Sequence, residues 1–125
     1  MAQKTCLIVD DSRTIRKIAR QIIETFNFAC DEADDGVPAL EYCKQQFPDM
    51  ILLDWNMPVM SGFDFMMAMR ALPGGDKPVI IFCTTENEFA QIAKAIGGGA
   101  NEYIMKPFDA DILKDKLIQT GLLEG

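Results

Sequence analysis

Histidine is absent from this chain of 125 residues, and basic residues are fewer than acidic ones. Without an imidazole the chain lacks the usual general base, the usual zinc ligand and any histidine that could donate a phosphoryl group in a relay. It carries 12 Lys and Arg residues against 19 Asp and Glu residues, which gives a net charge of −7. Such a chain repels phosphate backbones and has no Lys or Arg cluster to offset the repulsion, so we expect no direct binding of nucleic acid.

Long apolar runs and closely spaced cysteines are also missing. No apolar stretch approaches the roughly 20 residues needed to cross a bilayer, and the first residues are not followed by the apolar core of a signal peptide. We therefore expect a cytoplasmic protein with no membrane contact. The cysteines form no CxxC pair, and we expect buried, reduced thiols rather than disulfides at Cys6, Cys30, Cys43 and Cys83.

The length and the composition, with 49% apolar and 25% charged residues, predict one globular domain over residues 1–125. Short apolar runs alternate five times with amphipathic segments. This alternation predicts an α/β fold with a doubly wound, five-stranded parallel sheet and helices on both faces. The runs lack polar alternation, as strands buried on both sides do. The expected strands include residues 6–9, 28–30, 50–53, 79–83 and 103–105.

Apolar spacing and turn residues predict the helices between these strands. Gly36 is expected to make a turn, and Asp109 to cap the last helix. The segment Thr85-Glu86-Asn87-Glu88 is typical of a capping box, and Gly97–Gly99 would end the helix that follows it. The expected helices cover about residues 12–26, 38–47, 63–72, 85–96 and 109–120.

Polar groups follow four of the apolar runs at the point where each predicted strand ends. The first run ends in Asp10 and Asp11, and the third ends in Asp54. The fourth ends in Thr84, and the fifth ends in Lys106. The carboxyl ends of parallel strands lie along one edge of a sheet, where open α/β sheets bind their ligands. Three carboxylates, a hydroxyl and an ammonium in one crevice suit a divalent cation and a phosphoryl group.

The carboxylates would repel one another unless a cation relieved them or their pKa values rose. Mg²⁺ prefers oxygen ligands and is usually held by one or two carboxylates together with water and phosphate. Read alone, Asp10 and Asp11 favour helix capping; with Asp54 at the end of another strand, the metal interpretation is favoured. Asp54 is then a candidate nucleophile for phosphoryl transfer, and Thr84 and Lys106 are candidate partners of the phosphoryl oxygens.

Four motifs carry a resemblance to a known family. They are Val9-Asp10-Asp11-Ser12, Leu53-Asp54-Trp55-Asn56-Met57-Pro58 with Gly62, Cys83-Thr84, and Tyr103-Ile104-Met105-Lys106-Pro107-Phe108. With them the chain resembles the receiver domains of two-component response regulators, and in particular the single-domain chemotaxis type, over essentially all 125 residues. The resemblance implies a flavodoxin-like sheet with the strand order 2-1-3-4-5.

The resemblance also implies a metal site and a phosphoacceptor. Asp54 would accept the phosphoryl group. Asp11, Asp54 and the backbone carbonyl of Asn56 would bind Mg²⁺ directly, whereas Asp10 would bind it largely through water.

Further roles follow from the same resemblance. Thr84 and Lys106 would hold the phosphoryl oxygens, and the peptide bond from Lys106 to Pro107 would be cis. Tyr103 would change rotamer as Thr84 moves inward; read without the family, it is an ordinary strand aromatic. Asn56 and Glu86 would tune how fast the phosphoryl group is lost.

The implied function is that of a signalling switch rather than an enzyme acting on a separate substrate. A histidine kinase or phosphotransfer protein would phosphorylate Asp54, and the switch would then bind a downstream protein, with chemotaxis-type signalling favoured. The protein would promote its own phosphoryl transfer and dephosphorylation. We expect a monomer, with dimerisation on phosphorylation left open.

Three alternatives stay open from the sequence. A phosphatase of the haloacid dehalogenase type also uses a strand-end aspartate and Mg²⁺, but it needs a second acid two residues later, where this chain has Asn56. A pseudo-receiver would bind partners without phosphorylation and would not need the full set of acidic, Thr and Lys residues. The chain is also compatible with the receiver part of a longer DNA-binding regulator.

Overall fold

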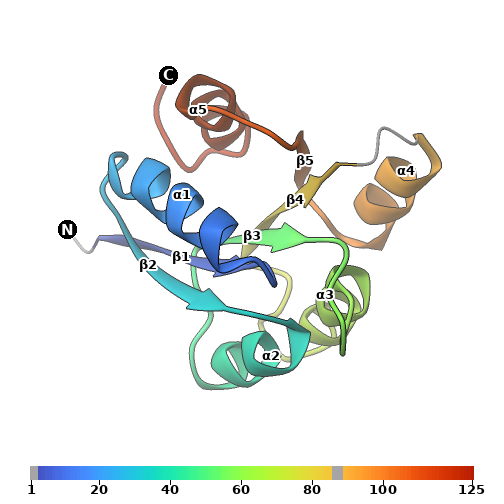
Figure 1. Cartoon of the computed structure of the whole chain (residues 1–125). Coiled ribbons are helices and arrows are strands. Elements are labelled where there is room, and N and C mark those ends of the chain that lie inside the picture. The colour runs from blue at the N-terminus through green and yellow to red at the C-terminus, as the bar shows by residue number, and fades with distance from the viewer. Residues whose placement is uncertain (1–2, 86–88) are drawn as a thin grey trace.

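The computed structural model describes residues 3–85 and 89–125, in which strands and helices alternate along the chain (Figure 1). In chain order the elements are β1 (Lys4–Val9), α1 (Arg13–Glu24), β2 (Phe28–Ala33), α2 (Gly36–Gln45), β3 (Met50–Asp54), α3 (Gly62–Arg70), β4 (Val79–Thr84), α4 (Phe89–Gly98), β5 (Glu102–Met105) and α5 (Ala110–Gln119). The predicted alternation of strands and helices is therefore confirmed.

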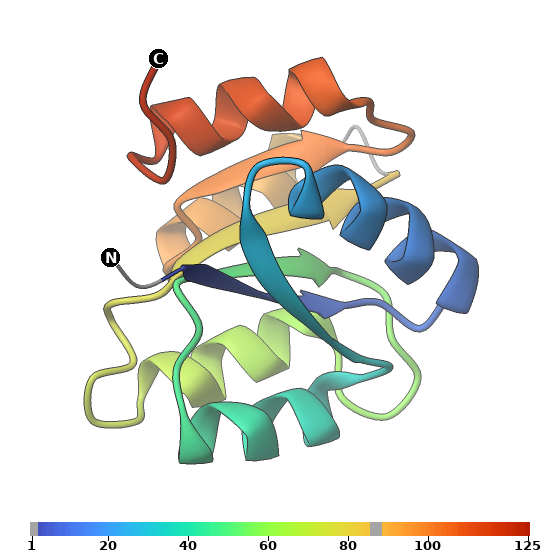
Figure 2. The same cartoon turned by 90° about the vertical axis from the view of Figure 1, so that its left-hand side faces the viewer.

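The strands form one sheet in the order β2-β1-β3-β4-β5, and each neighbouring pair is parallel. Figure 2 shows the arrowheads of the strands pointing toward the same side of the molecule. The carboxyl ends of the strands therefore share one edge, as the sequence predicts. The predicted fold class and strand order are both confirmed.

Each face of the sheet carries its own hydrophobic core. Helices α1 and α5 cover one face, and α2, α3 and α4 cover the other (Figure 1). Along β1, Cys6 and Ile8 belong to the first core, while Leu7 and Val9 belong to the second, because successive strand side chains point to opposite faces. Full burial of one such aliphatic side chain is worth about 1.5–3 kcal/mol, so the doubly covered central strands hold the site-bearing edge firmly.

Helix α1 begins at Arg13 because Ser12 caps it. The Ser12 hydroxyl accepts a hydrogen bond from the backbone N–H of Ile15 at 3.3 Å. The helix ends at Glu24, two residues before the predicted end, and the chain then turns through Asn27, whose φ is +67°. Asparagine tolerates this left-handed conformation better than most residues, so the turn needs no glycine.

Gly36 is the first residue of α2, so the prediction that it makes the turn was wrong. Asp35 caps this helix instead, and its carboxylate accepts a hydrogen bond from the Val37 N–H at 2.6 Å. At the other end of the chain, Asp109 caps α5 as predicted, accepting from the Ile112 N–H at 2.9 Å. The predicted capping box spans residues 85–88, of which residues 86–88 lie outside the described part of the chain, so this prediction is not tested.

The loop after β3 folds back onto the end of its own strand. The Gly62 N–H donates to the Trp55 carbonyl at 3.0 Å. A Cβ added at Gly62 would lie 2.0 Å from the backbone oxygen of Asp54. No side chain fits at that distance, so this glycine lets residues 55–62 close over the carboxyl edge of the sheet.

Arg70, the last residue of α3, joins the two connections that lead into β4 and β5. Its guanidinium donates to the carbonyls of Gly75 at 2.9 Å, Pro78 at 2.7 Å and Gly99 at 2.7 Å, and to the Asn101 side chain at 3.0 Å. Burial of this side chain lowers the pKa of Arg70. One half-buried cation thus holds the edge of the sheet opposite the strand ends that carry the predicted site.

Two further expectations concern the surface and the thiols. In residues 3–85 and 89–125, no helix combines the length and the hydropathy required to span a membrane. The thiols of Cys6, Cys30, Cys43 and Cys83 are free, and all four are buried.

Gly62→Ala is expected to lower the free energy of unfolding by roughly 2 kcal/mol, because the new Cβ meets a backbone oxygen that can move only with the loop. Urea unfolding measures this change. Gly97→Ala is the matched control in α4: nothing lies within 4 Å of the added Cβ, and alanine favours the helix by about 1 kcal/mol. Equal stability of Gly62→Ala and the wild type would contradict the closure of the loop.

Candidate functional site

The carboxyl edge of the sheet gathers three carboxylates. Asp10 follows β1, Asp54 ends β3, and Asp11 lies in the connection from β1 to α1. One oxygen from each side chain lies within 4.8 Å of an oxygen of the other two. Asp10 and Asp54 are 3% and 7% exposed, whereas Asp11 is exposed. The structure therefore brings together the three acidic residues that the sequence singles out.

Lys106 lies among these carboxylates. Its Nζ donates to Asp10 Oδ2 at 2.7 Å and to Asp54 Oδ1 at 3.1 Å, and its side chain is 15% exposed. Burial lowers the pKa of Lys106, but its hydrogen bond to Asp10 and the charge of Asp54 outweigh that effect and raise the pKa above its ordinary value. Lys106 is thus held in its charged form as the internal counter-ion of the site.

One ammonium does not balance three carboxylates. Burial raises the pKa of Asp54, and the charge of Asp10 raises it further, while Lys106 partly opposes both effects. Asp11 adds a smaller repulsion. The carboxylates outnumber the ammonium, so a bound cation would neutralise the excess negative charge of the site. A hard dication with oxygen ligands fits this donor set, because it relieves the repulsion that adds to the effect of burial on the pKa of Asp54.

Thr84 is the last residue of β4 and is 6% exposed. Its carbonyl accepts a hydrogen bond from the Lys106 backbone N–H at 2.8 Å. The strand pairing sets Cys83 beside Asp54, so Thr84 lies one residue beyond the end of β3. Three adjacent strands thus supply these groups: β3 ends in Asp54, β4 ends in Thr84, and Lys106 follows β5. This is the order that the sequence predicts.

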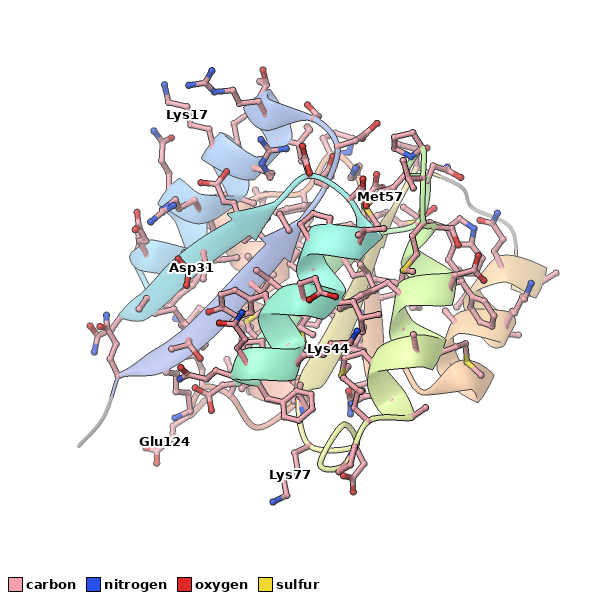
Figure 3. The ribbon with its side chains drawn as sticks, turned by 90° about the horizontal axis from the view of Figure 1, so that it is seen from below. Lys17, Asp31, Lys44, Met57, Lys77 and Glu124 are labelled. Carbon is pink, nitrogen blue, oxygen red and sulfur yellow. The ribbon has the colours of Figure 1, made fainter. Side chains whose placement is uncertain are left out.

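The loop from residue 55 to residue 61 covers the site from one side. Trp55 packs against Phe63 and Phe82, with ring centroids 5.6 Å and 5.1 Å apart. Met57, labelled in Figure 3, belongs to the same loop and packs against the core on the α2–α3–α4 face. Asn56 lies between them and is exposed. The loop is therefore anchored by its neighbours while Asn56 faces solvent two residues after Asp54.

Three further predictions concern residues in or after the last two strands. Tyr103 lies in β5 and is half-buried, with the Lys116 Nζ 4.9 Å from its ring centroid. The peptide bond from Lys106 to Pro107 is cis, as the resemblance implies. Glu86 lies outside the described residues. The role of Tyr103 as a switch stays a prediction.

Two features of the site were missed from the sequence. The Asp10 carbonyl accepts a hydrogen bond from Arg16 Nη1 at 2.7 Å. Next to Lys106 lies an apolar hollow of about 280 Å³, lined by Ile15, Ile18, Thr85, Lys106, Pro107 and Phe108. A cation one helical turn after an acidic pair is a signal that could have indicated Arg16. The hollow has no such signal, because its walls come from segments about 90 residues apart in the chain.

Comparisons with known proteins agree with this geometry. Residues 6–118 match the family model of the response regulator receiver domain. The chain is 40% identical over 112 residues to chemotaxis protein CheY-3 of Vibrio cholerae, with 89% of this chain and 86% of the relative covered. It is 38% identical over 112 residues to chemotaxis protein CheY of Pseudomonas aeruginosa, with 89% and 90% covered.

A solved structure extends the likeness to three dimensions. Chemotaxis protein CheY4 of Vibrio cholerae superposes with a TM-score of 0.89 at 31% identity, covering 94% of this chain and 98% of that one. The family match and the strand-end site together favour the signalling interpretation over a phosphatase. The chain therefore belongs to the response regulator receiver domain family and is a signalling switch of the CheY type.

Proposed function

We propose that Asp54 accepts a phosphoryl group from a histidine kinase or phosphotransfer protein in a Mg²⁺-dependent reaction. The observation that carries this proposal is the convergence of Asp10, Asp11 and Asp54 within 4.8 Å, with Lys106 bonded to two of them. Asp54 occupies the strand end between Asp10 and Thr84, and burial together with the charge of Asp10 raises its pKa. A bound cation opposes this shift and stabilises the ionised carboxylate, which is the nucleophile.

Asp11, Asp54 and the backbone carbonyl of Asn56 would hold Mg²⁺ directly, and Asp10 would do so largely through water. The ion supplies charge neutralisation for the incoming phosphoryl group. The Asp54 carboxylate attacks the phosphorus of a phosphohistidine, an oxygen–phosphorus bond forms, and the nitrogen–phosphorus bond of the donor breaks. The Lys106 ammonium would then move from the carboxylates to one phosphoryl oxygen, and the Thr84 hydroxyl would donate a hydrogen bond to another.

The same residues would couple phosphorylation of Asp54 to a conformational change. Because the Lys106 N–H is bonded to the Thr84 carbonyl at 2.8 Å, inward motion of one strand end draws the other with it. Tyr103 lies three residues before Lys106 and would change rotamer as Thr84 moves. This biases a two-state element, which includes β5 and α4, toward the form that binds a partner.

Hydrolysis of the acyl phosphate would reset the switch, and Asn56 and Glu86 are proposed to tune its rate. The protein would act as a cytoplasmic, single-domain monomer over residues 1–125 whose output is binding to a downstream protein. The names of its relatives support chemotaxis-type signalling as the pathway.

Asp54→Asn is expected to abolish labelling by acetyl phosphate, because a carboxamide oxygen does not form the acyl phosphate. Intact-protein mass spectrometry measures the phosphorylated fraction. Asp64→Asn, an exposed aspartate in α3, is the control and should be labelled like the wild type. Labelling that persists in Asp54→Asn would refute the phosphoacceptor assignment.

Mg²⁺ is expected to change the fluorescence of Trp55, which neighbours Asp54 and packs against Phe63 and Phe82. A titration gives the Kd. Asp11→Asn should weaken binding by at least about tenfold, or roughly 1.4 kcal/mol, because a dication loses a charged ligand. A wild type that gives no response up to tens of millimolar, a generous range for a weakly held ion, would count against the metal site.

Lys106→Ala is expected to leave labelling of Asp54 possible but to uncouple it from the conformational change. In the wild type, acetyl phosphate should alter amide hydrogen exchange in β4 and β5; in the variant this difference should shrink, most of all in β5, because the ammonium that draws the end of β5 toward the phosphoryl group is gone. Lys114→Ala, at an exposed position of α5, is the control. A wild-type exchange response in Lys106→Ala would refute the coupling role.

A further inference from the structure

Arg16 connects the first helix to the acidic loop of the site. It lies on the second turn of α1, and its side chain is 15% exposed. Nη1 donates to the Asp10 carbonyl at 2.7 Å, and Nε donates to Glu32 Oε1 at 3.0 Å. One guanidinium thus bonds to the loop after β1 and to the edge strand β2. Neither contact is needed to form the helix.

Asp10 is bonded through each of its polar groups. Its N–H donates to the Ala33 carbonyl at 3.1 Å, and its Oδ1 accepts from the Ser12 N–H at 2.9 Å. Its Oδ2 accepts from Lys106 at 2.7 Å, and its carbonyl accepts from Arg16. The backbone of Asp10 is therefore held from β2 on one side and from α1 on the other.

The carbonyl of Asp10 belongs to the peptide plane that places Asp11. A peptide unit is planar, so the direction of the Asp10 carbonyl determines where the N and Cα of Asp11 lie. Asp11 is exposed, and no hydrogen bond or ion pair of its side chain holds it to the rest of the domain in the described residues. Its position thus depends on the plane that Arg16 anchors.

A second arginine shares the Glu32 partner of Arg16. Glu32 offers one oxygen to Arg16 Nε and the other to Arg20 Nη1, at 3.0 Å and 2.9 Å. The hydrogen bond from Arg20, together with that from Arg16, lowers the pKa of Glu32 despite its partial burial, so the carboxylate stays ionised. Arg20 contacts Glu32 and Glu24 but not Asp10. The two arginines therefore share one anchor, and only Arg16 reaches the acidic loop.

We propose that Arg16 is a positioning residue of the metal site: by holding the Asp10 carbonyl it orients the peptide that presents Asp11 to Mg²⁺. The inference rests on the proposed Mg²⁺ site. It assigns to α1 a direct part in metal affinity, although Arg16 is not a ligand. Partners that orient the ligands of a metal typically change its affinity by 10- to 100-fold when they are removed.

The charge of Arg16 and its hydrogen bond to Asp10 would have opposite effects on the affinity for Mg²⁺. A guanidinium near the site repels a dication, so removal of its charge alone would tighten Mg²⁺ binding. Loss of the hydrogen bond to Asp10 releases the Asp10–Asp11 peptide and would weaken binding. The sign of the change in Kd therefore separates the two roles.

Mg²⁺ titrations of Trp55 fluorescence in the full chain test the proposal with matched variants. Arg16→Met removes both donors and is expected to raise the Kd about tenfold. Arg16→Lys keeps the charge but replaces the fork by one ammonium, so it is also expected to bind more weakly than the wild type. Arg20→Met removes an equal charge from the shared Glu32 anchor and should leave the Kd within about twofold of the wild type.

Urea unfolding with and without Mg²⁺ supplies a second readout. In Arg16→Met the stabilisation that Mg²⁺ adds should shrink in step with the raised Kd. A merely structural Arg16 would lower stability equally in both conditions and leave the Kd unchanged, which would overturn the inference, as would tighter binding by Arg16→Met. If Arg16→Met fails to fold, Arg16→Lys decides in the same way. If the wild type itself does not bind Mg²⁺, the proposed metal site fails and the inference falls with it.

Discussion

Electrostatic repulsion among three carboxylates is the constraint on which this site depends. Asp10, Asp11 and Asp54 meet because their strands are parallel neighbours, and two of them are almost fully buried. Lys106 relieves part of the repulsion by bonding to Asp10 and Asp54. In the proposed mechanism a cation or a phosphoryl group changes this balance, because each of them competes for the groups that bind one another in this structure.

The surrounding fold keeps the carboxylates together despite this repulsion. The two cores bury β1 and β3 on both faces, and the loop after β3 closes through Gly62 onto the Asp54 carbonyl. Arg16 and Ser12 hold the Asp10 backbone and carboxylate through separate hydrogen bonds. Packing energy spread over the whole domain thus offsets a local electrostatic cost, and the chemistry is confined to one edge of the sheet.

Much of the fold and most of the site could be predicted from the sequence, for identifiable reasons. Unbroken apolar runs predict buried parallel strands, and the polar residue after each run marks a strand end, so Asp54, Thr84 and Lys106 were found together. Arg16 and Arg70 were not predicted in the same way. Each binds backbone carbonyls, which every residue has, so the side-chain pattern does not identify their partners; only Arg16, soon after the acidic pair, leaves a weak signal. Gly36 was misplaced because a glycine two residues before a proline suits a turn and a first helical turn equally well.

Arg70 has a mechanical consequence for β4 and β5. It ties together the segments that enter these two strands, through carbonyls at Pro78 and Gly99. Thr84, Tyr103 and Lys106 lie at or beyond the exits of the same strands. The entering ends of β4 and β5 are therefore fixed, whereas in the described residues their exits carry no such bond from Arg70. Because Arg70 fixes the entering ends of both strands, we expect a force on Thr84 or Lys106 in the proposed switch to bend the ends of β4 and β5 rather than to slide whole strands through the core.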